Sequence, residues 1–264
     1  MGQLEKSDLR EAGLEGPVKK VVMKSVPKDE ISGTEITTWT FDRAGAQTGT
    51  TLRFVDRDGQ LIAERSLTRV VVRSLGTTEE RLIDEKGSLK ERIVRRFDSK
   101  GRQIERTEYG NHGQLTQRLV IKYEGNTKHT TLYSSDGSIH DRQLLTLDEH
   151  GRTLKSISFE SDGSKSTMED AYDKAGRHSE RIVFDENNTI RERLTYQYDG
   201  KGNQTSFVVS GPSGHVRYRL TSSYQYDNLG NWVSKDDEEW RPEDSENTST
   251  LARVTTRLIE YWDK

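Results

Sequence analysis

The residues that could do chemistry in this sequence are acids, histidines and aromatics, and most of them lie close to glycine. Asp-x-x-Gly segments such as Asp173 to Gly176 resemble part of a calcium loop. A calcium site needs about 6–8 oxygen ligands, however, and each of these segments offers only one or two. An Asp beside a turn glycine more often accepts hydrogen bonds from the backbone of its own turn. We therefore predict turn acids rather than metal ligands.

Nucleophiles and bases show no catalytic pattern. The six histidines are His112, His129, His140, His150, His178 and His215. None of them forms an HExxH motif, and the chain has neither a GxSxG motif nor a P-loop. We predict no catalytic residue, no metal ligand and no cofactor, and hence a protein that is not an enzyme. A site assembled from distant strands would not be visible in the sequence.

Aromatic residues recur four positions before turn glycines. Besides Phe41 they are Phe97, Tyr109, Tyr133, Phe159, Tyr172, Tyr198 and Tyr226, and Phe184 holds the same place before Asn188. The last eight form the candidate ladder. Stacked on successive strands, these rings would form ladders beside the turns. The interpretation we favour is cross-strand packing that stabilises a sheet. The alternative is an exposed stacking platform, a candidate aromatic binding ladder for sugars or a peptide.

Composition narrows the class of protein. The chain has 264 residues, of which 30% are hydrophobic and 32% charged, and its net charge is only −3. This balance gives no reason to expect a nucleic-acid partner, and no apolar run approaches the ~18 residues of a transmembrane span. The absence of cysteine excludes disulfides, thiolate metal sites and cysteine catalysis.

The elements that position the acids and aromatics repeat about every 25 residues. Two series of turn glycines interleave, one through Gly87, Gly113 and Gly137, the other through Gly101, Gly151 and Gly176. Asn126 and Asn188 occupy glycine positions, and Asn also tolerates a positive φ. We predict hairpins in which Asp caps the turn and Gly adopts the left-handed conformation. The predicted structural turn residues are Asp98, Gly101, Asp136, Gly137, Gly151, Gly163, Asp173, Gly176, Asp199, Gly202, Asp227 and Gly230.

Between the turns, apolar and polar residues alternate, as in Leu194 to Tyr198. This period is typical of strands with one apolar face. We predict an all-β antiparallel meander of about 15 to 18 strands in one domain, forming an extended, twisted or curled sheet. Because large apolar residues are too few to cover both faces, we expect an open, elongated or crescent-shaped single layer.

The ends of the chain are less regular than its middle. Residues 1–35 are predicted to be an N-terminal cap and first strand, with a short helix over 7–13. Residues 36–233 hold the repeats. Residues 234–264 are predicted to be a C-terminal capping loop and strand, in which the acidic stretch Lys235 to Asn247 shields the sheet edge. A cation-binding role for this stretch is the alternative.

The repeat resembles that of the RHS/YD-repeat family, in which a Tyr-Asp pair is followed by two residues, Gly, and Arg or Asn. The matching segments are Tyr172–Arg177, Tyr198–Asn203 and Tyr226–Asn231, with Phe97–Arg102 and Leu147–Arg152 as near variants. The resemblance covers roughly residues 36 to 233. Long RHS proteins form a hollow shell around a toxin domain, but this chain lacks the self-cleaving core and the toxin domain. It is also shorter than the closed shells of that family.

These observations lead to a functional hypothesis. We expect a non-catalytic, extracytoplasmic bacterial repeat protein that acts as a scaffold or binding surface for protein or glycan. The alternative is a shell-like or accessory component of a polymorphic-toxin system. The resemblance implies a secreted, periplasmic or cell-surface location, with a signal peptide or lipoprotein signal upstream of Gln3, while a cytoplasmic location stays open.

Overall fold

The structure is a computed structural model that describes residues 14–27, 33–56, 58–160, 162–242 and 250–263. These residues form eighteen strands in a single antiparallel sheet. The first nine are β1 (Val18–Pro27), β2 (Thr34–Phe41), β3 (Gln47–Val55), β4 (Leu61–Ser74), β5 (Thr77–Asp84), β6 (Leu89–Phe97), β7 (Gln103–Tyr109), β8 (Leu115–Glu124) and β9 (Thr127–Ser134). The others are β10 (Ile139–Leu147), β11 (Thr153–Glu160), β12 (Lys165–Tyr172), β13 (His178–Phe184), β14 (Ile190–Tyr198), β15 (Gln204–Ser210), β16 (Val216–Tyr226), β17 (Trp232–Trp240) and β18 (Thr250–Tyr261).

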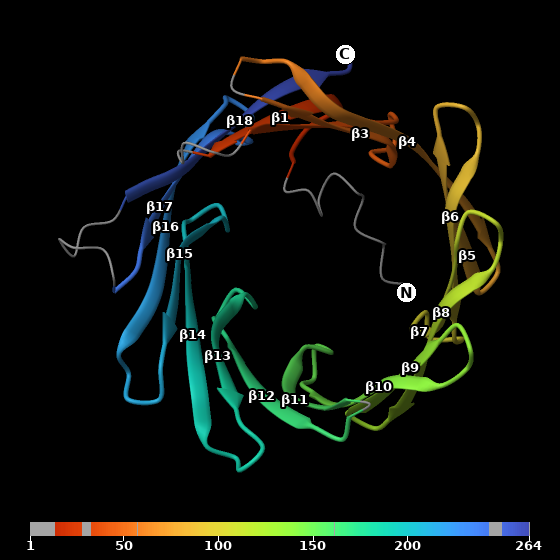
Figure 1. Ribbon diagram of the computed structural model, residues 1–264, viewed down its shortest axis with the longest axis vertical. Helices are drawn as coiled ribbons and strands as arrows, with labels where there is room; N and C mark the ends of the chain where they lie inside the picture. Colours follow the sequence, from red (N-terminus) through yellow and green to blue (C-terminus); the bar gives the residue numbers. More distant parts are fainter. Residues whose placement is uncertain (1–13, 28–32, 57, 161, 243–249, 264) are drawn as a thin grey trace.

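The sheet closes into a barrel because its first and last strands pair (Figure 1). Each strand pairs with its neighbours in the sequence, and β1 pairs with both β2 and β18. Val21 therefore lies opposite Trp39 on one side and Ile259 on the other. All-β antiparallel architecture is confirmed, whereas the predicted open, extended sheet is wrong.

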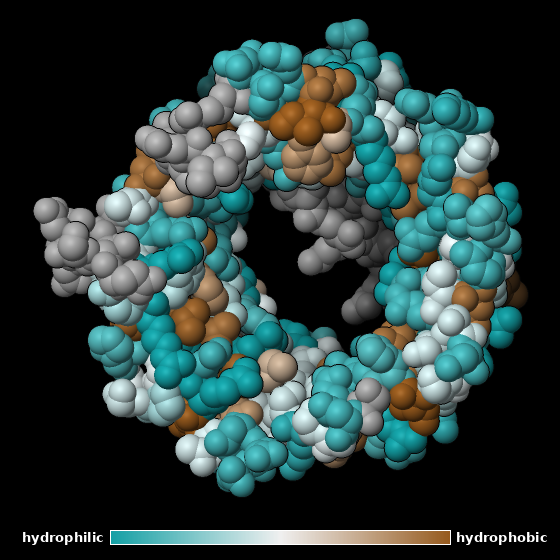
Figure 2. Space-filling view, in the orientation of Figure 1, coloured by the Kyte–Doolittle hydropathy of each residue, from teal (hydrophilic) through white to brown (hydrophobic). Residues whose placement is uncertain are grey.

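The error has a physical reason. An open sheet leaves two edges of unpaired backbone groups, and closure removes both. Low apolar content does not oppose closure when the barrel is wide. Eighteen strands spaced ~4.8 Å apart and tilted by about 35–45° enclose a barrel about 35 Å across, too wide for side chains to fill. Figure 2 shows the opening through its middle. The wall is a single layer, as the composition indicated, but it is a closed one.

The inner face of the wall can be identified from residues 14–17, which lead into β1 from inside the ring (Figure 1). Leu14 in this segment packs against Val18, Val21 and Phe41 in a buried cluster that Trp39, Ile259 and Tyr261 flank. Because residues paired across neighbouring strands lie on the same face of a sheet, the strand register identifies the inner face of all the other strands. Most buried strand residues lie on it, namely Thr37, Ile93, Glu108, Ile121, Ser158, Asp170, Val183, Ser222, Asp237 and Thr255, whereas Thr167 is buried on the other face.

Two expectations for the chain ends need comment. The predicted helix over 7–13 lies outside the described residues. The acidic residues Asp236 to Glu239, expected in an edge-capping loop, instead lie within strand β17, because closure leaves no edge to cap. Among the residues that the structure describes, no helix is long and apolar enough to cross a membrane.

The turns between strands hold glycine in the left-handed region. The predicted turn glycines have φ values from +76° to +88°. Asn188 takes the same conformation at φ 63°, but at the other asparagine position it is Gly125, not Asn126, that has the positive φ. Asp residues before these glycines accept hydrogen bonds from the turn backbone, as described below.

One turn offers a clean test of this backbone requirement. Gly202 has a φ of +88°, while Gly200, two residues earlier, does not lie in the left-handed region, and a Cβ at either would meet no atom within 4 Å. We expect Gly202→Ala to lower the free energy of unfolding by about 1–2 kcal/mol through left-handed strain. Gly200→Ala should leave it unchanged or raise it by up to about 1 kcal/mol. Denaturant unfolding of both variants checks this, and equal losses would contradict it.

Candidate functional site

Each Tyr-Asp turn is built around its aspartate. Asp173 Oδ1 accepts hydrogen bonds from the backbone N–H groups of Ala175 and Arg177, both at 2.9 Å, and its Oδ2 accepts one from Arg177 Nε at 2.7 Å. The backbone and side-chain hydrogen bonds from Arg177 lower the pKa of Asp173. Asp98, Asp199 and Asp227 cap their turns in the same way. Asp136 caps Ser138.

The residue after the turn glycine connects neighbouring repeats. The Arg177 guanidinium lies over the Tyr198 ring at 4.7 Å and donates to the Asp199 carbonyl at 3.1 Å. Arg152 lies over Tyr172 in the same way, at 4.6 Å. Cation–π contacts of this kind contribute about 0.5–2 kcal/mol. These contacts recur at one rim of the barrel, where each joins one turn to the tyrosine that precedes the next turn at that rim. We call each such link between a turn and the following tyrosine a rung.

Asparagine replaces arginine in the last two rungs and makes hydrogen bonds instead. Tyr226 donates to Asp199 and accepts from Asn203 Nδ2, and Tyr261 donates to Asp227 Oδ2 at 2.6 Å. Asn231 donates to the Tyr261 hydroxyl at 2.8 Å. The first set of bonds joins the β14–β15 turn to the end of β16, and the second joins the β16–β17 turn to the closing strand β18.

Asn231 also fastens the segment that enters the barrel. It is 1% exposed, its Oδ1 accepts from Glu15 N at 2.6 Å, and its Nδ2 donates to the Glu15 carbonyl at 3.0 Å. This pair of bonds reproduces what a neighbouring strand would offer. The barrel thus already holds a short segment of its own chain, with Leu14 in an apolar site on the wall and the Glu15 backbone on a side-chain amide of the β16–β17 turn.

The eight aromatic residues of the predicted ladder are divided between two faces and two rims. Successive turns lie at opposite ends of an up-and-down barrel, so residues ending even-numbered and odd-numbered strands are far apart. Phe97, Tyr172, Tyr198 and Tyr226 lie on the inner face at one rim, and Tyr109, Tyr133, Phe159 and Phe184 lie on the outer face at the other. Ring–ring contacts found among the described residues join none of these eight to another.

A different line of rings, which sequence reasoning missed, crosses the inner face from β12 to β16. We name Tyr172, His178, Tyr196, Phe207 and Tyr218 the aromatic row. Consecutive ring centroids are 4.7, 5.9, 5.4 and 6.1 Å apart, and all five side chains are half-buried. Of the five, only Tyr172 lies four residues before a glycine with a positive φ, Gly176. The signal that could have found the others is their position in mid-strand on the inner side.

The aromatic row lies beside a buried ion pair. Asp170, 7% exposed, accepts hydrogen bonds from Arg181 Nε at 2.7 Å and from Arg181 Nη2 at 3.1 Å. His178 Nε2 is 3.9 Å from the same carboxylate. Burial raises the pKa of Tyr196, so its hydroxyl stays protonated and able to donate. The row therefore combines stacking surfaces with charged and hydroxyl groups.

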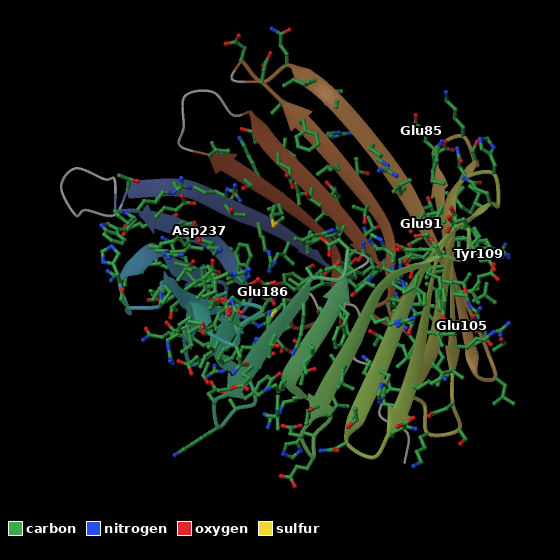
Figure 3. The ribbon with its side chains drawn as sticks, turned by 60° about the horizontal axis from the view of Figure 1, so that its bottom comes forward. Glu85, Glu91, Glu105, Tyr109, Glu186 and Asp237 are labelled. Carbon is green, nitrogen blue, oxygen red and sulfur yellow. The ribbon has the colours of Figure 1, made fainter. Side chains whose placement is uncertain are left out.

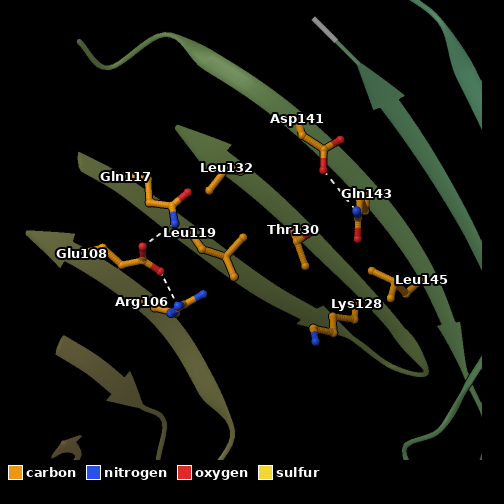
Figure 4. A pocket seen from close by; sticks show the side chains of 10 residues that line it. All are labelled: Arg106, Glu108, Gln117, Leu119, Lys128, Thr130, Leu132, Asp141, Gln143 and Leu145. Carbon is orange, nitrogen blue, oxygen red and sulfur yellow. Dashed lines mark hydrogen bonds and ion pairs between the residues drawn. The ribbon is translucent and has the colours of Figure 1, made fainter. Parts of the chain in front are cut away.

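A second feature of the inner face is a hollow of about 310 Å³ over β7 to β10 (Figure 4), which we name the polar hollow. It is lined by Arg106, Glu108, Gln117, Leu119, Lys128, Thr130, Leu132, Asp141, Gln143 and Leu145. Arg106 forms an ion pair with Glu108, which also accepts from Gln117. Asp141 Oδ2 accepts from Gln143 at 3.1 Å. Two cations and two anions leave the lining without net charge.

The acidic residues of β17 are already paired. Asp237, on the inner face (Figure 3), accepts from Ser222 at 2.6 Å and lies 2.8 Å from Lys235 Nζ. Nearby on β18, Arg257 lies 3.5 Å from the Trp232 ring centroid, and burial lowers its pKa to about 10. Within the described part of the chain, no three His, Asp or Glu side chains come together as metal ligands would.

The outer face carries charges in mid-strand. Glu105 of β7 (Figure 3) forms ion pairs with Arg96, at 3.2 Å, and with Arg118, at 2.6 Å. Lys155 and Glu169 pair across β11 and β12 at 2.8 Å. Charged pairs in these positions face water readily, because exposed ion pairs keep most of their hydration.

Comparison with known proteins establishes the fold and no more. No protein-family model matches the chain, and no curated protein sequence matches it. The fold is similar to a porin-like protein from Bacteroides uniformis, with a TM-score of 0.53 and 16% identity over 92% of this chain and 98% of that one. A porin-like protein from Bacteroides vulgatus gives a TM-score of 0.36 at 14% identity, covering 94% of this chain and 99% of that one.

A further similar structure is that of TcdB2-TccC3-Cdc42. It matches 88% of this chain and 14% of its own, with 14% identity and a TM-score of 0.30. At that score the likeness does not establish a common fold. The resemblance to the RHS/YD-repeat family therefore stays a prediction from the sequence, while the first comparison agrees with a closed all-β barrel.

The Asn231 contacts predict a difference between two equivalent residues. Asn231→Ala removes the partners of the Glu15 N–H and carbonyl groups, so we expect a loss of about 2–3 kcal/mol in the free energy of unfolding. Asn203→Ala, at the same position of the preceding repeat, lacks the Glu15 contacts and should cost about 1 kcal/mol. Denaturant unfolding gives both values, and hydrogen exchange at Glu15 should accelerate only in the first variant. Equal effects would argue against the contact.

The tyrosine rungs predict an alkaline loss of stability. Burial and the hydrogen bond to Asp199 raise the pKa of Tyr226 to about 12, and burial and the bond to Asp227 do the same for Tyr261. An unfolded tyrosine titrates near pH 10. The stabilisation is complete below that pH and is lost as the pH rises toward 12, because the unfolded chain releases protons that the folded chain retains.

We therefore expect the denaturant midpoint to fall between pH 10 and 12, and to fall less in a Tyr226→Phe/Tyr261→Phe double variant. The matched control is Tyr109→Phe/Tyr133→Phe on the outer face. If both double variants flatten the pH dependence equally, the two hydrogen bonds are not its source.

Proposed function

We propose that this chain is a non-catalytic scaffold, a water-filled barrel whose inner wall binds an extended protein or glycan. The observation that carries the proposal is the aromatic row, with ring centroids 4.7 to 6.1 Å apart on a concave face. Aromatic faces bind apolar surfaces of peptides and sugars alike. The adjacent Asp170–Arg181 pair provides hydrogen-bonding groups that fix orientation.

The segment at Leu14 and Glu15 supports the proposal. It shows the inner wall using an apolar site for one side chain and a side-chain amide for the backbone. A bound polypeptide would be held by the same two kinds of contact. The width of the lumen, about 35 Å between opposite backbones, leaves room for a chain to lie along the wall.

The location we propose is extracytoplasmic: secreted, periplasmic or at the cell surface of a bacterium. The lack of cysteine is compatible with this, and so is the resemblance to secreted YD-repeat proteins. Mid-strand pairs on the outer face, such as Arg118–Glu105 and Arg53–Glu64, favour a wall with water on both sides.

A second candidate function is a shell-like or accessory component of a polymorphic-toxin system. The hollow barrel favours it, because a closed wall around a polar lumen could shelter a polypeptide. The two candidates differ in what the lumen holds. A toxin or immunity gene beside the natural gene would support the second, and surface-polysaccharide genes would support the first.

The test is binding by variants of the aromatic row. Wild-type protein is screened against an array of bacterial and plant glycans and a library of unstructured peptides. We expect Tyr196→Ala/Phe207→Ala to bind about tenfold more weakly or worse, because truncation of central aromatic anchors is costly. Tyr133→Ala/Phe159→Ala, on the outer face, is the matched control. Wild-type affinity in the inner double variant, or no binder in either library, would overturn the proposal.

A further inference from the structure

We propose that the polar hollow over β7 to β10 is a binding site for an uncharged sugar unit. This inference rests on the proposed role of the inner wall as a binding surface, and it narrows the ligand from protein or glycan to carbohydrate. The hollow lies apart from the aromatic row, since strand β11 separates β10 from β12. Its chemistry can therefore be tested separately.

Strand register gives the hollow a defined floor and two ends. Arg106, Leu119, Leu132 and Asp141 lie opposite one another across β7, β8, β9 and β10. The two leucines form an apolar strip between a guanidinium and a carboxylate (Figure 4). Leu145 extends the apolar surface beside Lys128. A sugar ring matches such a strip, because its C–H groups form an apolar face and its hydroxyls project at the edges.

The two ends of the strip carry unused hydrogen-bonding atoms. Arg106 Nε and Asp141 Oδ1 are buried and have no hydrogen-bond partner among the described residues. A buried donor or acceptor without a partner costs free energy. A hydroxyl group can satisfy either atom, because it donates one hydrogen bond and accepts others. Neighbouring hydroxyls on one ring can therefore bond to a donor and to an acceptor.

The balance of charge favours a neutral ligand. Arg106 and Lys128 oppose Glu108 and Asp141, so a charged ligand would meet a like charge somewhere in the hollow. Gln117, Gln143 and Thr130 add groups that donate and accept. The volume of about 310 Å³ lies at the small end of ligand pockets, about 300–1,000 Å³. That size suits one or two sugar rings.

The first experiment needs no mutation. Glucose, galactose, mannose and N-acetylglucosamine, with their disaccharides, are titrated into the full chain by calorimetry, alongside glucuronate and glucosamine. We expect at least one neutral sugar to bind, and to bind more tightly than its charged counterpart. Hydrogen exchange with that sugar should slow in β7 to β10. If no neutral sugar binds, or if the protection falls elsewhere, the inference is overturned.

The second experiment changes the unpartnered carboxylate. Asp141→Asn keeps the shape of the hollow, so we expect binding about tenfold weaker through loss of a charged hydrogen bond. The melting temperature should stay the same or rise, because the variant removes a buried charge with an unused oxygen. Glu149→Gln, on the exposed β10–β11 turn, is the control and should bind as wild type does. Unchanged affinity in Asp141→Asn would refute the site.

The two proposals can fail separately. Sugar protection of β7 to β10 that is lost in Asp141→Asn but kept in Tyr196→Ala/Phe207→Ala supports the hollow as a site independent of the aromatic row. If that row variant also binds its glycan or peptide as wild type does, the proposed function fails while the hollow remains. Polymer binding that depends on the row, without any sugar effect on β7 to β10, keeps the scaffold and removes the hollow. Tighter binding of a peptide than of every neutral sugar in the hollow would also remove it.

Discussion

Closure of the sheet by β1 and β18 is the constraint on which the rest of the structure depends. The wall is one layer thick, and among the described residues no second sheet or helix packs against its strands. The buried apolar cluster of Leu14, Val18, Val21 and Phe41 lies at this seam. The last tyrosine rung ends there too, through Tyr261. Apolar burial is thus concentrated where the pairing joins residues more than 220 positions apart, and where loop-closure entropy is most unfavourable.

Strands and turns could be predicted from the sequence because their causes are local. An Asp that caps its own turn, as Asp173 does, and a glycine such as Gly176 four residues after a tyrosine act within six residues. Closure has no such local sign. It follows from small twists and tilts added over eighteen strands, and Val21 and Ile259 look like any other strand residues. The apolar fraction was informative about the number of layers, but it could not distinguish an open layer from one closed around water.

The candidate site could not be found from the sequence because the sequence does not show which residues of each strand face inward. Counting back from glycine finds residues that end strands, but whether such a residue points inward depends on strand length and on bulges. A bulge lies where Tyr172 pairs with His178, and it helps to place both rings on the inner face with Tyr196. The lining of the polar hollow gave even less signal. Arg106, Gln117 and Asp141 are typical residues of a solvated strand face, and only the register brings them together.

In this geometry most of the residues that join neighbouring repeats are separate from the inner-face residues available to a ligand. The turn acids, glycines and rung residues occupy the rims and the positions next to them, and each rung contacts only its neighbour, as in other repeat proteins. Inner-face residues in mid-strand, such as Phe207 and Leu132, take no part in the hydrogen bonds and cation–π contacts of the turns. Their identity can therefore change without opening the barrel, provided that buried polar groups find partners. A wide polar lumen makes this feasible, since no dense core has to be repacked. The features that make the sequence repetitive build the wall, and the features that depart from the repeat are where a specific ligand would be recognised.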